Sequence, residues 1–64
     1  MIRIAVVDDE ERVCEQIERL LQECSNAVHV EFKVDIFYSG ERLISELKNN
    51  QKYDLIFLDI ELYK

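Results

Sequence analysis

The sequence contains no proline, no tryptophan and a single glycine, Gly40. This scarcity excludes a collagen-like repeat and a Pro- or Gly-rich disordered chain. Long hydrophobic runs are missing too, because the longest ones, Ile4–Val7 and Leu55–Leu58, are too short to cross a bilayer or to form the core of a signal peptide. We therefore expect a globular chain that makes no membrane contact and stays in the cytoplasm.

Basic residues are also scarce, with 8 Lys and Arg against 14 Asp and Glu, and the net charge is -6 at pH 7. This balance opposes the neutralisation of phosphates on which nucleic-acid binding depends, so we expect no nucleic-acid contact by this segment. Hydrophobic residues make up 48% of the 64 positions. They suffice for one small core, so residues 1–64 are treated as a single unit.

The two cysteines, Cys14 and Cys24, fall in one predicted helix, where their spacing corresponds to about 15 Å. A disulfide cannot span that distance. We expect reduced thiols, with Cys24 packed as a small hydrophobic residue. The lone His29 has no second ligand at metal spacing and is expected to be an ordinary surface residue.

Hydrophobic periodicity predicts strands that alternate with helices. The apolar segments 2–7 and 53–59 are typical of buried parallel strands. Residues 28–36 alternate between apolar and polar side chains, which predicts an edge strand with one solvated face. The first helix is predicted to end near Ser25 and Asn26, and it carries a stripe formed by Val13, Ile17, Leu20, Leu21 and Cys24.

A second helix is predicted to begin at Ser39 and Gly40, with Ser39 as its N-cap, and to end at Asn49 and Asn50. The resulting β-α-β-α-β order predicts an α/β fold with a parallel sheet and right-handed crossovers. With the alternating strand at the edge, the strand order is 2-1-3 and the helices cover opposite faces. The winding direction then reverses between the first and third strands, where open α/β sheets bind their ligands.

Acidic side chains follow both strands at this switch point: Asp8 and Asp9 after the first and Asp59 at the end of the third. Three carboxylates in one crevice repel one another unless a proton or a hard cation is bound. Mg²⁺ suits one or two carboxylates together with water and a phosphate. The pattern therefore predicts a cation site formed by these acids.

A purely structural interpretation is also open for each part of this cluster. Asp8 and Glu11 match a helix capping box, in which acids at a helix start are also favoured by the helix dipole. Asp59 could cap a following helix. A carboxylate that faces an acid pair across a switch point is nevertheless more typical of a functional site.

The segments IAVVDDEE, FYSGERLISEL and YDLIFLDIEL resemble the receiver domain of two-component response regulators. The motif Leu-Asp-Ile-Glu-Leu at residues 58–62 is most similar to receivers of LytTR-type regulators. The resemblance covers essentially the whole chain. It implies a flavodoxin-like fold of which these residues supply about two and a half of five βα units.

The resemblance also implies roles for individual residues. Asp59 is the expected phosphoacceptor for a phosphoryl group from a sensor histidine kinase. Asp9 is the expected direct Mg²⁺ ligand, Asp8 holds the metal through water, and Glu61 contributes its backbone carbonyl. The metal is required because a carboxylate approaches an anionic phosphoryl group only when charge is neutralised.

The sequence departs from the family at two points. Tyr63 stands where the family usually has proline, and the family's Ser/Thr and Lys after the fourth and fifth strands have no counterpart up to Lys64. We therefore expect a truncated receiver that does not signal alone, and that is labelled by a small phosphodonor little or not at all. Its exposed third strand is expected to drive self-association.

Three alternatives remain beside the receiver interpretation. Asp59-Ile60-Glu61 resembles the Asp-x-Asp motif of HAD-type Mg²⁺-dependent phosphatases, although Glu61 replaces the second Asp. A flavodoxin-like nucleotide binder needs a glycine-rich phosphate loop, whereas the turn after the first strand is acidic. The third alternative is a non-catalytic α/β fragment that self-associates.

Overall fold

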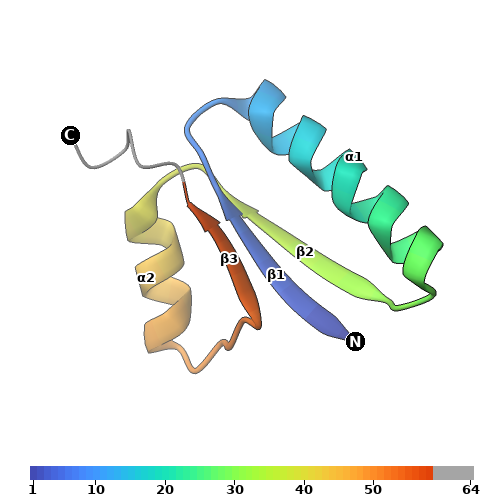
Figure 1. Cartoon of the computed structure of the whole chain (residues 1–64). Helices are drawn as coiled ribbons and strands as arrows, with labels where there is room; N and C mark the ends of the chain where they lie inside the picture. The colour runs from blue at the N-terminus through green and yellow to red at the C-terminus, as the bar shows by residue number, and fades with distance from the viewer. Residues whose placement is uncertain (59–64) are drawn as a thin grey trace.

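A computed structural model describes residues 1–58 of the chain. The elements along the chain are β1 (Ile2–Val7), α1 (Glu11–Val28), β2 (Phe32–Phe37), α2 (Gly40–Lys48) and β3 (Leu55–Leu58). Figure 1 shows the three strands side by side, flanked by the two helices. No helix in this part of the chain is both long and apolar enough to cross a membrane.

The sheet is parallel and has the order β2-β1-β3, which confirms the predicted fold class and topology. The register is continuous at the carboxyl ends of the strands, where Val7 is the partner of both Phe37 and Leu58. The three strands therefore end level with one another. The residue after β1, Asp8, lies at this common edge.

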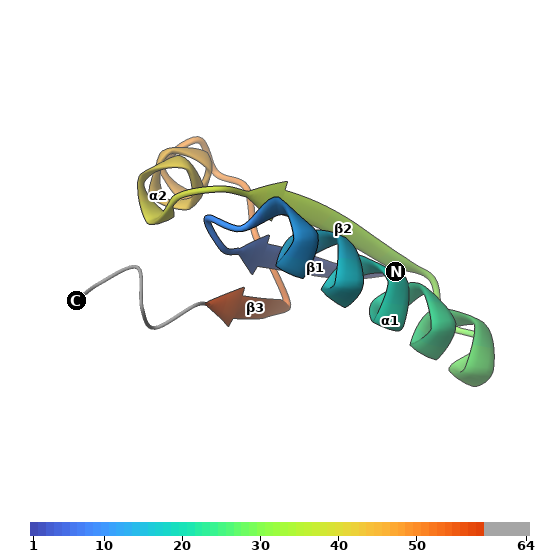
Figure 2. The same ribbon diagram turned by 90° about the horizontal axis from the view of Figure 1, so that it is seen from above.

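The helices pack on opposite faces of the sheet, as predicted (Figure 2). Ile4 and Val6 lie in a core cluster with Cys14 and Leu21 of α1. Ala5 and Val7 instead pack against Leu43 of α2. Because successive side chains of a strand point to opposite faces, β1 contributes to both cores and is buried from Ile4 onward.

The first helix is longer than the sequence pattern predicts, and the second strand starts later. The helix continues past Ser25 to Val28, and His29 ends it in the left-handed conformation, at φ 56°, with its N–H donating to the Ser25 carbonyl. The Ser25 hydroxyl donates to the Val30 carbonyl. Ser25 therefore stabilises the turn that follows α1 and does not mark the end of the helix. Val28 and Val30 consequently lie outside β2.

The stripe predicted for α1 is confirmed at Ile17 and Leu21, which lie in or against the core, and is wrong at Leu20 and Cys24. Cys14, Leu21 and Ser25 are buried, while Leu20 is 60% exposed and Cys24 is exposed as a free thiol. The prediction that Cys24 packs as a small hydrophobic residue is therefore wrong. Because one position corresponds to about 100° around a helix, a register error of one residue moves a side chain from the core to solvent.

The predicted bounds of α2 are confirmed. The Ser39 hydroxyl caps the helix by accepting from the Arg42 N–H at 3.3 Å. The helix ends at Lys48, and Asn50 adopts a positive φ of 68° just beyond it. Asparagine tolerates this conformation better than most residues do, which is why the Asn pair marked the end of the helix correctly.

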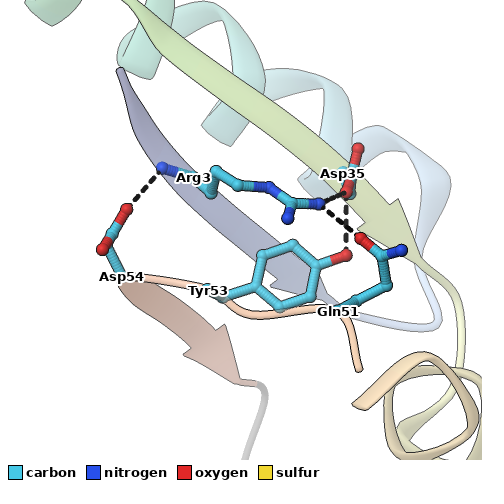
Figure 3. A network of polar contacts seen from close by, with 5 residues as sticks. All are labelled: Arg3, Asp35, Gln51, Tyr53 and Asp54. Carbon is cyan, nitrogen blue, oxygen red and sulfur yellow. Dashed lines mark hydrogen bonds and ion pairs between the residues drawn. The ribbon is translucent and has the colours of Figure 1, made fainter. Parts of the chain in front are cut away.

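A polar cluster on the α2 side of the sheet anchors the start of β3 (Figure 3). The Arg3 guanidinium lies 3.7 Å from the Asp35 carboxylate, donates to Gln51 at 2.8 Å and stacks over the Tyr53 ring at 5.1 Å. The Tyr53 hydroxyl donates to Asp35 at 2.8 Å. Asp54 accepts from the Arg3 N–H and donates its own N–H to the Arg3 carbonyl, both at 2.8 Å.

Candidate functional site

The candidate site lies at the carboxyl edge of the sheet, where β1 leads directly into Asp8 and Asp9. Asp8 is buried, with 8% of its surface exposed, whereas Asp9 is exposed. The structure thus separates the two acids into one that belongs to the protein interior and one that faces solvent. Two adjacent carboxylates with different surroundings can take different roles toward a ligand.

Asp8 is held in position by three contacts. Its N–H donates to the Phe37 carbonyl at 3.1 Å and extends the β1–β2 ladder by one residue. Its carboxylate accepts from the Glu10 N–H at 2.8 Å. Its own carbonyl accepts from the Cys14 thiol at 3.5 Å, a contact that ties the loop to the first turn of α1.

The capping box that the sequence allows does not form. The N-cap of α1 is Glu10, which makes no side-chain cap bond, and the Asp8 carboxylate closes a turn before the helix begins. Asp8 therefore shapes the loop between β1 and α1 and does not cap the helix. This local role does not exclude a ligand, because a carboxylate has room for about four hydrogen bonds or metal contacts.

The acid pair has no basic side chain as a partner within residues 1–58. The one ion pair there joins Arg3 and Asp35, away from the carboxyl edge. Burying a carboxylate without a compensating charge is costly, so the surroundings of Asp8 favour a bound cation. Burial, reinforced by the nearby Asp8 charge, also raises the pKa of the Cys14 thiol, which keeps it protonated as a donor.

A small cavity opens beside Asp8 between the ends of β1 and β3. Its volume is about 170 Å³, and it is lined by Val7, Asp8, Ile17, Phe57 and Leu58. Among the described residues that line it, Asp8 is the one charged residue and the others are apolar. The low polarity of these walls strengthens electrostatic contacts made inside it.

Two residues of the predicted site, Asp59 and Glu61, lie outside the described residues. Asp59 is the next residue along the chain after Leu58, whose partner in the sheet is Val7. Across residues 1–58, no group of three or more His, Cys, Asp or Glu side chains is close enough to hold a metal ion. Asp8 and Asp9 therefore lie at the carboxyl edge of the sheet, as predicted, and the predicted position of Asp59 is not tested.

The donor set fits Mg²⁺ chemically. Asp8 and Asp9 supply hard carboxylate oxygens, and no softer ligand competes with them, because Cys14 is protonated and directs its thiol to the Asp8 carbonyl. Mg²⁺ is commonly bound by one or two carboxylates, with water and phosphate oxygens as the remaining ligands. Two acids at one end of a strand are compatible with that pattern.

Sequence reasoning missed the polar cluster around Arg3. A groove of about 520 Å³ runs along β2 next to it and includes Arg3, Asp35 and Tyr53 in its lining. The alternation of residues 28–36 predicts a solvent-facing Asp35, and no local sequence pattern indicates its contacts with Arg3 and Tyr53. No family model, curated protein or solved structure matches the chain.

Proposed function

We propose that the chain is the amino-terminal part of a response-regulator receiver domain, in which Asp59 accepts a phosphoryl group with the help of Mg²⁺. The observation that carries the proposal is the buried Asp8 at the level ends of β1 and β3, with no basic partner among the described residues. Asp59 follows Leu58 directly in the sequence. The position of Asp59 in the sequence thus agrees with a phosphoacceptor that faces Asp8 and Asp9.

Each acid has a distinct role in this proposal. Asp9, which is exposed, is the direct metal ligand, whereas Asp8, fixed by its bond from the Glu10 N–H, acts through a water molecule. The carbonyl of Glu61 is a further ligand. When bound, Mg²⁺ supplies neutralisation of the charge that gathers on the phosphoryl oxygens.

The transfer is a displacement at phosphorus. A carboxylate oxygen of Asp59 forms the new P–O bond while the P–N bond to a histidine of the donor kinase breaks, and the imidazole leaves with the electron pair. The bonds from the Glu10 N–H and the Cys14 thiol would hold Asp8 in place during this step. Positioning and charge neutralisation supply most of the catalysis in phosphoryl transfer.

The partners that follow from this role are a sensor histidine kinase, as phosphodonor, and a second copy of the chain at the free edge of β3. A cytoplasmic location and the lack of nucleic-acid contact by this acidic segment belong to the same proposal. The family's Ser/Thr and Lys, which clamp the phosphoryl oxygens, have no counterpart in these 64 residues.

A second candidate function is a non-catalytic α/β module that self-associates. The exposure of all four β3 side chains, between 38% and 47%, favours it. This candidate requires neither Mg²⁺ nor a reactive Asp59. A phosphatase of the HAD type is less favoured, because that motif normally closes the first strand of its fold, and here β1 with its own acid pair precedes it.

The test is phosphorylation by a small acyl phosphate in the presence and absence of Mg²⁺, followed by mass spectrometry of the intact chain and its peptides. We expect slow, Mg²⁺-dependent labelling confined to Asp59, abolished in Asp59→Asn and retained in the matched control Asp54→Asn. Label that survives in Asp59→Asn would show that the acceptor is wrong. Only slight label is expected from these residues, so a lack of Mg²⁺ binding at Asp8 and Asp9, and not a lack of label, would favour the non-catalytic module.

A further inference from the structure

The side chains of β3 do not by themselves specify its register against β1. All four residues of the strand are apolar: Leu55, Ile56, Phe57 and Leu58. A hydrophobic pattern specifies register when a slip would exchange polar for apolar side chains on a buried face. In β3 a slip exchanges one apolar side chain for another, whatever covers the two faces. The pairing of Val7 with Leu58 therefore depends on contacts outside the strand.

The residue before β3 is bound to a single residue of β1 by two hydrogen bonds. The Asp54 carboxylate accepts from the Arg3 N–H, and the Asp54 N–H donates to the Arg3 carbonyl, both at 2.8 Å. These bonds hold Asp54 beside Arg3, one step before the pair formed by Ile4 and Leu55. A slip of one residue moves a strand by about 3.3 Å, which is enough to break both bonds.

Tyr53 provides a second anchor, on the α2 side of the sheet (Figure 3). Its ring lies edge to face with Phe37 at 6.1 Å and is covered by the Arg3 guanidinium at 5.1 Å. Its hydroxyl donates to the Asp35 carboxylate at 2.8 Å. Tyr53 thus contacts β1 and β2 at the same time, and a slip of the following strand would pull it away from both.

A bend at Asp54 sets the face that each residue of β3 takes. Tyr53 packs on the α2 side of the sheet, whereas Leu55 is the partner of Ile4, which packs against α1. In an unbroken strand, residues 53 and 55 would lie on the same face. The anchors before the bend therefore fix both the register of β3 and the direction of its side chains.

We propose that Asp54 is a positioning residue which, together with Tyr53, sets the register of β3 and so the level at which the chain leaves this strand. The consequence for the site rests on the proposed function. A slip of two residues keeps each side chain on its face but moves the residue after Leu58 by about 7 Å along β1. Mg²⁺ contacts its ligands at about 2 Å, so Asp59 would no longer share a cation with the acid pair.

The positioning role belongs to the acceptor oxygen of residue 54 and not to its charge. The Arg3 N–H is a neutral backbone donor, and the ion pair of residues 1–58 joins Arg3 to Asp35 instead. The side-chain carbonyl of asparagine can accept the same bond, whereas alanine has no acceptor. Asp54→Asn should therefore keep the register, and Asp54→Ala should lose it.

Nuclear Overhauser contacts between strands measure the register in the 64-residue chain. We expect a contact between Val7 and Leu58 in the parent and in Asp54→Asn. In Asp54→Ala this contact should weaken relative to the contacts between β1 and β2. Leu21→Val, which removes a methylene group from the core under α1, controls for lost stability and should keep the contact. An unchanged contact in a folded Asp54→Ala would overturn the proposal.

An insertion tests the same inference if Asp54→Ala does not fold. One glycine placed between Asp54 and Leu55 leaves both anchors in the chain and should shift β3 by one residue, so that Val7 lies opposite Phe57. A contact between Val7 and Leu58 that survives the insertion would contradict the proposal, because β3 or the residues after it would then set the register.

Mg²⁺ titration distinguishes this inference from the proposed function. In Asp54→Ala, saturable amide shifts should persist at residues 8–10 and be lost at residues 58–61, whereas Asp54→Asn and Leu21→Val should keep both. Shifts that persist at both places in Asp54→Ala, or vanish at both, would show that Asp54 does not position the acceptor. A parent without saturable shifts would overturn the proposed function, and the contact between Val7 and Leu58 would still decide the register.

Discussion

At the scale of single residues, Asp8 carries the account of the site. Its carboxylate accepts one bond from the Glu10 N–H before any ligand arrives, and its backbone N–H and carbonyl are held by Phe37 and Cys14. Preorganised oxygen ligands favour a cation that must give up part of its water shell. Asp9 is exposed and adds a second carboxylate without the cost of burial.

Tyr53 gives a prediction about pH. Burial and the hydrogen bond to Asp35 raise its pKa to about 12, against about 10 for an unperturbed tyrosine. The stability supplied by the neutral phenol is therefore fully present below pH about 10 and is lost as the pH rises through about 12. Tyr53→Phe lacks the bond to Asp35 and should be less stable than the parent by about 1 kcal/mol near neutral pH.

The difference in unfolding free energy between the parent and Tyr53→Phe should narrow between pH about 10 and about 12. Urea unfolding of both proteins at a series of pH values measures it. A difference that stays constant up to pH about 12 would mean that the Tyr53 hydroxyl does not contribute through its neutral form.

At the scale of elements, the end of α1 distinguishes the observed helix from the one the sequence pattern predicts. His29 occupies the left-handed region, where glycine is favoured, and Ala27 lies within the last helical turn. His29→Gly should raise the free energy of unfolding by about 0.5 kcal/mol, and Ala27→Gly should lower it by about 0.5–1 kcal/mol. If the helix ended at Ser25, Ala27→Gly would have almost no effect.

Element types and the sheet order were predictable because they depend on periodicity and on topological rules that hold for any α/β chain. Ser39 and Asn50 marked the bounds of α2 through local backbone chemistry. The end of α1 was not predictable in this way, because Ser25 directs its hydroxyl to Val30, a contact visible only in the folded chain. The burial of Cys14 and the exposure of Cys24 depend on how α1 is rotated against β1 and β2.

The candidate site was predictable in part for a similar reason. Strand ends of a parallel sheet coincide, so acids that follow β1 and β3 could be assigned to one edge from the sequence. The difference in burial between Asp8 and Asp9, and the bond that Asp8 accepts from Glu10, could not. The Arg3 cluster joins residues that are distant in sequence, and no local pattern encodes such contacts.

At the scale of the whole molecule, the described sheet has a charged edge at β2 and an apolar edge at β3, while Asp8 and Asp9 lie at its carboxyl end. These features divide the surface into regions with separate chemistry. The proposed cation binding is assigned to the carboxyl end, and the proposed self-association is assigned to the β3 edge. Substitutions at Ile56 should therefore change assembly without removing the ligands of the cation.

The central claim is that Asp8 and Asp9, together with the residues after Leu58, bind Mg²⁺. Titration with Mg²⁺ followed by amide chemical shifts tests it most directly, with Asp9→Asn as the disabled variant and Asp54→Asn as its control. The account predicts saturable shifts concentrated at residues 8–10 and 58–61, lost in Asp9→Asn and kept in Asp54→Asn. Small shifts spread evenly over the acidic surface, and equal in all three proteins, would contradict it.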